Sequence, residues 1–534
     1  MLFTEEQERI ITSTEHNYTF VQAFAGTGKT STLLEFARRN NESKILYLTF
    51  NTALANCENI KEMNNIESHT IHGFAFQKLG YEDVEINKFS LKFLRNLYNV
   101  DTRFANTIKR AYNFFLASTS IKPKMKHVLE TDNTGLKNPE NVLEYMKDLY
   151  DGMENGKYLM SHDFYLKKYI LSKPILDYDI ILIDEAQDLS PCVLKLLAQQ
   201  DCKRVFVGDI FQQIYQFRNV VNPFDYIYQF DDTILLNLTK TFRYGPDLCR
   251  LSNDFLQTFT QNDINIECDE NCDTSIYSSK CNLPSYTFIS RTNKGILEKA
   301  VELCNDGKKF DLFDKMYNFK KEKEIFDLLH QSKKTIHEDL IPIIEKKFGR
   351  VKNLKQLKEL VIDLQNFKWL NRILITEKYK ENIWGKIENN FVKGADIILM
   401  NAHQSKGLEF DTVVLGNDFR QLIHKSGSFA KYHQEDEYNL MYVAMTRAKK
   451  RLYINDNLKA FLRKKYDKSI VYKECMVNRC HKCGEKTNLQ ISHGRENLPV
   501  YVKPRLEMTY HFCLECTDIY INSIPIINVK FYRN

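Results

Sequence analysis

The chain has 534 residues, of which 43% are hydrophobic and 27% charged, a balance typical of a soluble globular protein of about three or four domains. A net charge of +6 restricts any nucleic-acid surface to a local groove and excludes a general basic coat. No apolar run approaches the roughly 18 residues of a membrane span, and the charged start MLFTEEQERI predicts no signal peptide. We therefore expect a cytoplasmic or nuclear protein whose thirteen cysteines are reduced or bound to metal.

The first pattern with chemical meaning is the stretch AFAGTGKTST, which begins at Ala23. It matches the phosphate-binding loop G-x-x-x-x-G-K-[ST] except that alanine replaces the first glycine. Gly26 and Gly28 free the backbone so that successive N–H groups can point at phosphate oxygens, while Lys29 would reach the β/γ-phosphates and Thr30 would bind Mg²⁺. An apolar run before the loop and helical spacing after it predict a strand and a helix N-terminus. An ordinary glycine turn is the alternative for this stretch alone.

A buried strand followed by acidic residues comes next, in DYDIILIDEAQD. Ile180 to Ile183 form the apolar run, and Asp184 stands at its carboxyl end, where a phosphate-binding loop fold needs a second contact to Mg²⁺. Glu185 beside it could orient and deprotonate the attacking water. The alternative interpretation is a strand that ends in a solvated acidic turn.

The stretch KRVFVGDIFQQIYQFR predicts another buried strand and then a polar loop. In that loop Gln212 could sense a γ-phosphate, and Tyr215 and Phe217 offer two aromatic faces. Aromatic side chains that follow such a loop could stack on bases and so connect base binding to the state of the nucleotide. Taken alone, the two aromatics could equally belong to the core.

Three more patterns follow along the chain: LTKTFRYGPD, MNAHQSKGLEFD and EYNLMYVAMTRAKKRL. With the earlier three they stand in the order of the motifs of the UvrD/Rep-like superfamily 1 helicases, and their wording is similar to that of the F-box DNA helicases and their viral and bacterial relatives. The ordered motifs span residues 3 to 452, and AxAGxGKT is the usual form of the loop in that family. The resemblance implies an α/β fold with two RecA-like P-loop NTPase lobes, helical insertions and ATP bound between the lobes.

The resemblance also implies roles for single residues around ATP and Mg²⁺. Gln7 in FTEEQ would hydrogen-bond the adenine edge, Phe242 would stack on the base, and Glu409 would contact the ribose. Arg243 and Arg447 match two arginines that reach the γ-phosphate across the cleft. The implied catalytic residues are Lys29, Asp184, Glu185, Gln212, Arg243 and Arg447, with Thr30 and Asp184 at Mg²⁺; the implied nucleotide contacts are Gln7, Ala25, Gly26, Thr27, Gly28, Lys29, Thr30, Ser31, Phe242 and Glu409.

Contacts to single-stranded DNA follow from the same resemblance. Phe50 in LTFNTALA and His72 in SHTIHGFAF match contacts of the first lobe, and Tyr215 and Phe217 match the stacking aromatics. His403 in MNAHQSKGLEFD joins this DNA-contacting set.

The expected layout places both lobes around insertions. Both inserts are shorter than those of large bacterial relatives, so an accessory role is not transferred to them. We expect the first RecA-like, ATP-binding lobe at 1–80 and 170–245, a helical insertion at 81–169, the second lobe at 246–292 and 392–460, a second helical insertion at 293–391, and a C-terminal zinc-knuckle module at 465–534. TFISRTN and DTVVLG are expected to be strands of the second lobe.

The C-terminal module is predicted from two C-x2-C pairs that 29 residues separate. The pairs are Cys480 with Cys483 and Cys513 with Cys516, and this spacing is typical of a structural tetrahedral Zn²⁺ site. His481 and His511 are rival ligands, and reduced buried thiols are the alternative.

LQISH, which ends at His493 between the pairs, also loosely resembles an HNH nuclease finger. Such a site needs a further asparagine and histidine for its own metal, and the tail supplies Asn522 but no histidine. A binding or docking module is therefore the favoured interpretation.

These observations together predict an ATP-dependent single-stranded DNA translocase and DNA helicase that acts in DNA repair, recombination or replication, and the resemblance implies 3′ to 5′ polarity. Its partners would be single-stranded and duplex DNA, with no membrane. A translocase that displaces proteins from DNA and a helicase-nuclease with an HNH-like finger are the alternatives, and RNA stays open because backbone tracking does not read the 2′-OH. No F-box precedes the first motif, so the ubiquitin-ligase partnership of the eukaryotic relatives is not expected.

The predicted zinc site is testable through its ligands. Cys480→Ser or Cys513→Ser should unfold the segment from about residue 470 onward, because a structural metal supplies folding energy to its own module. DNA-stimulated ATP hydrolysis should stay near the wild-type rate, since the motifs end at residue 452. Metal analysis of protein purified without chelator gives the decisive reading, and an absence of zinc there contradicts the site.

Overall fold

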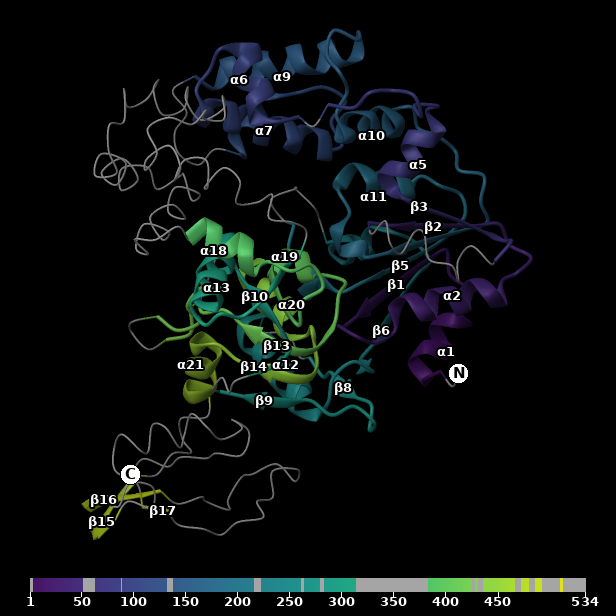
Figure 1. The fold of residues 1–534 in the computed structure, drawn as a ribbon. Helices are drawn as coiled ribbons and strands as arrows, with labels where there is room; N and C mark the ends of the chain where they lie inside the picture. The colour runs from purple at the N-terminus through teal and green to yellow at the C-terminus, as the bar shows by residue number, and fades with distance from the viewer. Residues whose placement is uncertain are drawn as a thin grey trace. The chain divides into compact units, whose positions relative to one another are not determined.

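The computed structural model describes residues 3–50, 63–87, 89–131, 138–215, 222–260, 264–278, 283–313, 383–424, 428–430, 436–465, 472–479, 486–491 and 510–511. The chain divides into unit 1, Met1–Lys240, and unit 2, Thr241–Asn534. Each unit contains a six-stranded parallel sheet with helices around it, so the predicted α/β class is confirmed (Figure 1).

The sheet of unit 1 has the strand order β3-β2-β4-β5-β1-β6, and every neighbouring pair is parallel. Parallel neighbours align their carboxyl ends, so the loops that follow β1, β4 and β5 leave the sheet at one edge. The strands are β1 (Tyr18–Ala23), β2 (Ile45–Thr49), β3 (Ile66–Thr70), β4 (Ile180–Asp184), β5 (Lys203–Gly208) and β6 (Thr233–Leu238).

Both faces of this sheet are buried, which explains why its strands read as continuous apolar runs. Along β4, Ile181 and Ile183 contribute to one hydrophobic cluster, while Ile180 and Leu182 contribute to another. Because successive side chains of a strand point to opposite faces, these two clusters lie on the two sides of the sheet.

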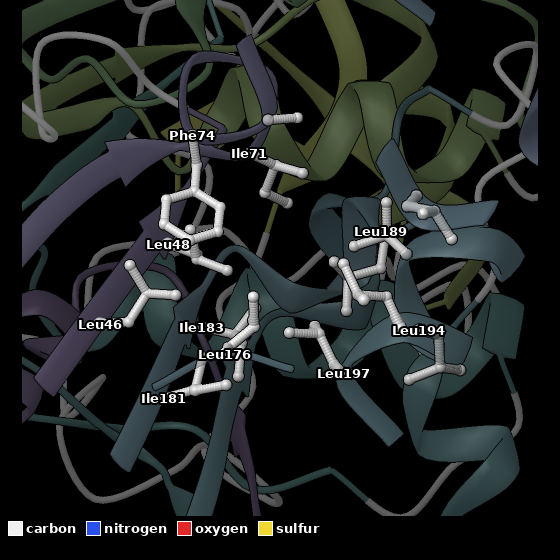
Figure 2. Packing of buried hydrophobic residues seen from close by; sticks show 14 of the residues in the cluster. Leu46, Leu48, Ile71, Phe74, Leu176, Ile181, Ile183, Leu189, Leu194 and Leu197 are labelled. Carbon is white, nitrogen blue, oxygen red and sulfur yellow. The ribbon is translucent and has the colours of Figure 1, made fainter. Parts of the chain in front are cut away.

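Helices from different parts of the sequence cover the two faces. One cluster receives side chains of α1 (Glu5–Ile11) and α2 (Lys29–Arg39). The other packs α5 (Ile71–Lys78) and α11 (Pro191–Ala198) against the strands. Figure 2 shows this second cluster, with Leu46, Leu48, Ile181 and Ile183 of the strands near Ile71 and Phe74 of α5 and near Leu194 and Leu197 of α11.

A block of helices stands between β3 and β4 in the sequence and has a core of its own. Figure 1 shows α6, α7 and α9 side by side, and their buried residues, among them Tyr112, Phe115 and Met146, form one cluster. Helix α10 (His162–Leu171) joins this block to the sheet, because its Phe164 belongs to the core of the block and its Tyr165 belongs to the core of the sheet. The helices are α6 (Leu91–Tyr98), α7 (Thr102–Ala117), α8 (Met125–Leu129), α9 (Pro139–Glu154) and α10 (His162–Leu171).

The sheet of unit 2 has the order β11-β12-β10-β13-β14-β9, again with parallel neighbours only. The predicted strands in TFISRTN and DTVVLG are confirmed as β10 and β13. The six strands are β9 (Ser275–Tyr277), β10 (Tyr286–Ser290), β11 (Asp311–Leu312), β12 (Ile397–Asn401), β13 (Phe410–Leu415) and β14 (Ala448–Tyr453).

Helices cover this second sheet as well. Side chains of α13 and α18 form one cluster with the strands, and Phe255, Phe259, Tyr438 and Phe461 join α12, α20 and α21 through ring contacts. The helices are α12 (Pro246–Thr260), α13 (Asn293–Asn305), α18 (Ile383–Asn390), α19 (Ala402–Ser405), α20 (Asp436–Met445) and α21 (Asp456–Lys465).

Smaller elements complete the described chain. β7 (Lys240–Thr241) pairs with β8 (Glu267–Cys268), and three short 3-10 helices are η1 (Ala186–Asp188), η2 (Ile210–Gln212) and η4 (Pro223–Gln229). Near the C-terminus β15 (Tyr472–Arg479), β16 (Lys486–Ile491) and β17 (Tyr510–His511) form an antiparallel sheet. Within the described ranges, no helix combines the length and the apolar character that crossing a membrane requires.

The division into units falls between Lys240 and Thr241, five residues before the expected end of the first lobe at 245. Phe242 and Arg243 therefore belong to the second unit, together with the other residues expected to act from the second lobe. The four cysteines of the predicted zinc site lie outside the described residues, as do His493 and Asn522 of the HNH comparison.

The two-sided burial of the first sheet predicts which truncations are costly. Ile183→Ala should lower the free energy of unfolding by about 2–5 kcal/mol, because it removes a completely buried side chain from a packed face. Ile121→Ala is the matched control, since that side chain is 67% exposed and its loss should change stability by less than about 0.5 kcal/mol. Thermal and urea unfolding of both variants measure the difference, and equal effects would contradict the packing described here.

Candidate functional site

The loop between β1 and α2 has the geometry of an anion site. Gly26 and Gly28 have φ angles of 79° and 78°, a left-handed conformation that glycine adopts at little cost. The loop ends at Gly28, the N-cap of α2, so the helix begins at Lys29. Its shape is held from within, since the Thr27 hydroxyl donates to the Phe24 carbonyl at 2.9 Å. Backbone N–H groups at a helix N-terminus bind phosphate groups readily.

Asp184 at the end of β4 faces this loop and is almost completely buried. Its Oδ2 accepts hydrogen bonds from the Thr30 hydroxyl at 2.9 Å and from the Tyr47 hydroxyl at 2.7 Å, while Oδ1 accepts from the Glu185 N–H at 2.8 Å. Burial raises the pKa of the Asp184 carboxyl, and the Glu185 charge raises it further, whereas the Lys29 charge lowers it. The hydroxyl and the carboxylate thus form a compact pair of hard oxygen ligands, which suits Mg²⁺.

Glu185 stands beside this pair in a strained conformation. Its φ of 56° lies in the left-handed region, which a side chain with a Cβ rarely adopts. The residue is the N-cap of η1, and its carbonyl accepts from the Asp188 N–H at 3.0 Å. Strain of this kind clusters at sites where a side chain must be aimed, which agrees with the catalytic role predicted for this carboxylate.

A second buried carboxylate, Asp209, follows β5 at the same edge. Its Oδ2 accepts from the Gln212 amide at 2.6 Å, and its Oδ1 accepts from the Phe211 N–H at 3.1 Å. Burial raises the pKa of Asp209 to about 6, and the Lys29 charge opposes that rise. Lys29 therefore acts electrostatically on carboxylates at the ends of both β4 and β5.

Gln187 connects the loops after β4 and β5 and is completely buried. Its Nε2 donates to the Glu185 carboxylate, and its Oε1 accepts from the Asp209 N–H at 3.0 Å. Its main-chain carbonyl accepts from the Gln213 amide at 2.6 Å. Gly208 makes room for this arrangement, because a Cβ there would lie 2.5 Å from Oε1.

Gln7, predicted to bind an adenine edge, lies against the phosphate-binding loop. Its Oε1 accepts from the Thr4 N–H at 3.0 Å in the capping box of α1, and its Nε2 donates to the Thr27 carbonyl at 3.4 Å. The amide thereby joins the N-terminal helix to the loop. A Cβ on Gly28 would lie 2.9 Å from Nε2, and the φ of 78° at this position also favours glycine. Adenine recognition stays a prediction.

Within unit 2, the residues predicted to serve the nucleotide form a local cluster. Arg243 donates from Nε to Glu409 at 3.0 Å and from Nη1 to the Thr446 carbonyl at 3.3 Å. Arg447 is buried, and its guanidinium donates to the carbonyls of Val443 at 2.8 Å and Leu408 at 3.1 Å. Both guanidinium groups are thus held by acceptors within unit 2. Phe242 next to them is 42% exposed, so its ring is accessible for stacking.

The residues predicted to contact DNA have different surroundings. Phe50 is partly buried against the hydrophobic cluster that packs α5 and α11 on the first sheet, and His72 is half-buried with its Nε2 3.0 Å from the Asp163 carboxylate. Tyr215 is also partly buried, and His403 lies on α19 in unit 2. Phe217 lies outside the described residues.

A cavity of about 920 Å³ in unit 2 lies apart from these residues. It opens between α13 and α21 over the sheet, and Phe288, Lys299 and Tyr453 contribute to its lining. Among the described residues that line it, the predicted site residues do not occur.

Sequence reasoning missed three residues of the site: Tyr47, Gln187 and Asp209. Gln187 and Asp209 stand inside stretches that the sequence already marks, DYDIILIDEAQD and KRVFVGDIFQQIYQFR, and Tyr47 directly precedes LTFNTALA. The signal available for Asp209 was a polar residue directly after a buried strand, whereas Gln187 stands three residues after the end of β4. Tyr47 gave no such signal, because it reads as one more apolar position of β2.

Comparison with known proteins supports the resemblance to helicases that the sequence motifs indicate. The UvrD-like helicase C-terminal domain matches residues 157–459, more than half of the chain, and an AAA domain matches residues 6–218. The chain is 30% identical over 510 residues to F-box DNA helicase 1 of Gallus gallus, covering 86% of this chain and 49% of that protein. It is 30% identical over 495 residues to F-box DNA helicase protein 1 of Schizosaccharomyces pombe, covering 82% and 55%. The chain thus spans about half the length of the curated relatives it matches.

The Tyr47 hydroxyl predicts a pH effect on the binding of Mg²⁺ and ATP. Its hydrogen bond lowers the pKa of Asp184, which burial has raised, so Tyr47→Phe should let that pKa rise further. Because the ionised carboxylate is the form that binds Mg²⁺, the loss of binding on acidification should begin at a higher pH. The Tyr47 hydroxyl donates to a charged oxygen, and such a hydrogen bond is stronger than one between neutral groups, so the shift toward higher pH should be measurable.

Titration of a fluorescent ATP analogue with Mg²⁺ over a pH series measures this shift. Tyr18→Phe is the matched control, because the Tyr18 hydroxyl donates to the Ala198 carbonyl at 3.1 Å and comes from the opposite end of β1. If the pH at which binding is lost is the same in Tyr47→Phe and in the wild-type protein, Tyr47 has no role in the binding of Mg²⁺.

Proposed function

Since the chain belongs to the UvrD-like family of superfamily 1 helicases, in the F-box DNA helicase branch, we propose that it is an ATP-dependent DNA helicase that translocates on single-stranded DNA. The observation that carries the proposal is the meeting of Lys29, Thr30, Asp184 and Glu185 at one edge of a parallel sheet. A phosphate-binding loop, a pair of Mg²⁺ ligands and a base for the attacking water are the parts that phosphoryl transfer needs.

Each residue of this edge has a defined task in hydrolysis. The loop N–H groups and Lys29 bind the phosphates, and the Thr30 hydroxyl with Asp184 would hold Mg²⁺, which neutralises charge on the phosphate oxygens. Glu185 orients and deprotonates the attacking water. Gln212 detects whether the γ-phosphate is present, from the loop that follows β5.

The second unit is proposed to complete the nucleotide site. Arg243 and Arg447 would stabilise the charge that develops on the transferred phosphoryl group, which an arginine does efficiently when its position is fixed in advance. Support comes from the carbonyl and carboxylate acceptors that hold both guanidinium groups. Glu409 would contact the ribose, Phe242 the base, and Gln7 the adenine edge.

Single-stranded DNA is proposed to bind through aromatic and histidine side chains, and the polarity is proposed to be 3′ to 5′. Phe50, His72, Tyr215, Phe217 and His403 are the proposed contacts. Stacking is worth about 1–3 kcal/mol per base and tolerates any sequence, so such contacts can be released and remade at each step. DNA repair, recombination or replication is the proposed setting, and the four cysteines of the tail are proposed to bind structural Zn²⁺.

Two assays test the proposed function directly. ATP hydrolysis is compared with single-stranded DNA, duplex DNA and RNA as stimulants, and unwinding is compared on duplexes with a 3′ or a 5′ single-stranded tail. Strong stimulation by single-stranded DNA and unwinding of the 3′-tailed duplex are expected. No stimulation by any nucleic acid would contradict the proposal, and unwinding of the 5′-tailed duplex alone would reverse the polarity.

The proposed nucleotide site predicts that Lys29→Ala and Glu185→Gln both lose ATP hydrolysis, but for different reasons. Lys29→Ala should abolish ATP hydrolysis, because the phosphates lose their main point charge, and DNA binding should persist. Glu185→Gln should keep nucleotide affinity and lose turnover, since the water is no longer activated. Binding of a fluorescent nucleotide and of labelled single-stranded DNA, measured beside hydrolysis, separates the two; a hydrolytically active Lys29→Ala protein would disprove the loop assignment.

A further inference from the structure

Gln187 is buried in unit 1 with each polar group of its amide engaged on a different loop. Nε2 donates to the Glu185 carboxylate after β4, and Oε1 accepts from the Asp209 N–H after β5 at 3.0 Å. Leaving a buried polar group without a partner costs about 1–3 kcal/mol, so both contacts bind the amide firmly in place.

The loop after β5 is attached to Gln187 at two points. Asp209 is bound by its N–H, and Gln213 donates from its side chain to the Gln187 carbonyl at 2.6 Å. These two residues enclose η2, which carries Gln212, and Asp209 in turn binds the Gln212 amide at 2.6 Å. A displacement of Gln212 would therefore pull on Asp209 and, through it, on Gln187. Gln187 is also the residue that binds the Glu185 carboxylate.

The backbone of β5 comes close to the Gln187 amide at Gly208. A Cβ on Gly208 would lie 2.5 Å from Oε1 and 3.0 Å from the Gln187 main-chain nitrogen. The backbone of β5 thus approaches Gln187 at a distance that only glycine allows. The position of the amide is fixed by sterics as well as by hydrogen bonds.

We propose that Gln187 is a positioning residue that mechanically couples the Glu185 carboxylate to the loop of Gln212 and Tyr215, so that hydrolysis and grip on single-stranded DNA change together. The inference rests on the proposed function and deepens it. When the γ-phosphate is present, the Gln187 amide holds Glu185 on the water and the loop in one arrangement. When it leaves, a shift of Gln212 reaches Glu185 through Asp209 and Gln187, and it reaches Tyr215 along the chain.

The experiment uses the full chain and Gln187→Met, which keeps the size of the side chain and removes both polar arms. Gln200→Met is the matched control, since Gln200 is also a buried glutamine of unit 1 and its amide binds the Leu176 N–H at 2.8 Å and the Leu196 carbonyl at 2.9 Å. For each protein, kcat and KM for ATP are measured with and without single-stranded DNA, together with the melting temperature.

Gln187→Met should lower the DNA-stimulated kcat by about tenfold to a hundredfold, because a small misplacement of a catalytic group has effects of that size. KM for ATP should stay within about twofold of the wild-type value, since the phosphate contacts are intact, and the ratio of stimulated to unstimulated kcat should fall. Gln200→Met should lower the melting temperature and leave this ratio unchanged.

A folded Gln187→Met protein with the wild-type stimulation ratio would overturn the coupling. If that variant does not fold, Gln187→Glu decides, because it keeps the oxygen that accepts from Asp209 and replaces the donor that faces Glu185. A lowered kcat at unchanged KM supports the proposal, and a wild-type kcat rejects it. Failure of wild-type protein to respond to DNA would instead contradict the proposed function, so the two failures are distinguishable.

Discussion

The hydrogen bonds that converge on the buried Asp184 carboxylate are the interaction on which the proposed nucleotide site of unit 1 depends. They bring together three segments that are distant in sequence: Thr30 at the start of α2, Tyr47 within β2, and Glu185 after β4. A buried charge needs such partners, because the cost of removing it from water is otherwise large. An arrangement of the loop, the strand and the acidic turn without these hydrogen bonds would leave the buried carboxylate unpaired and so destabilise the fold.

The parallel sheet makes this convergence possible. Strands buried on both faces leave few positions for polar side chains except at their ends, and parallel order aligns those ends at one edge. The phosphate-binding loop, the acidic turn and the loop of Gln212 therefore emerge as neighbours, although about 180 residues separate the first from the last. Gln187 uses that proximity, since its amide spans the two loops that follow β4 and β5.

Unit 2 repeats the architecture with a different chemical content. Its sheet has the same parallel character, but the side chains at issue are guanidinium groups, and they are fixed by backbone carbonyls and by Glu409. A buried arginine with rigid acceptors loses little conformational freedom when it meets a phosphate, because that freedom is already lost. The proposed nucleotide contacts thus include buried acids in unit 1 and two arginines in unit 2.

Local patterns in the sequence determined the elements of the site. Apolar runs predicted β1, β4, β5, β10 and β13, because periodicity is a property of short segments. The glycines indicated a loop with a freely rotating backbone, and Gly26 and Gly28 have positive φ angles there. Order along the chain was enough to indicate the family. The boundary at Lys240 was only approximately predictable, since a division between compact units depends on contacts and not on composition.

Only the tertiary structure decided which polar groups touch. Tyr47 reads as an apolar position of a strand, and its hydroxyl acquires a role because β2 lies beside β4. Gln187 and Asp209 stand in marked stretches, yet nothing in their neighbours along the chain indicates that one binds the other. Hydrogen bonds between loops are set by strand order and register, which many distant contacts fix together, and a single sequence does not display those contacts.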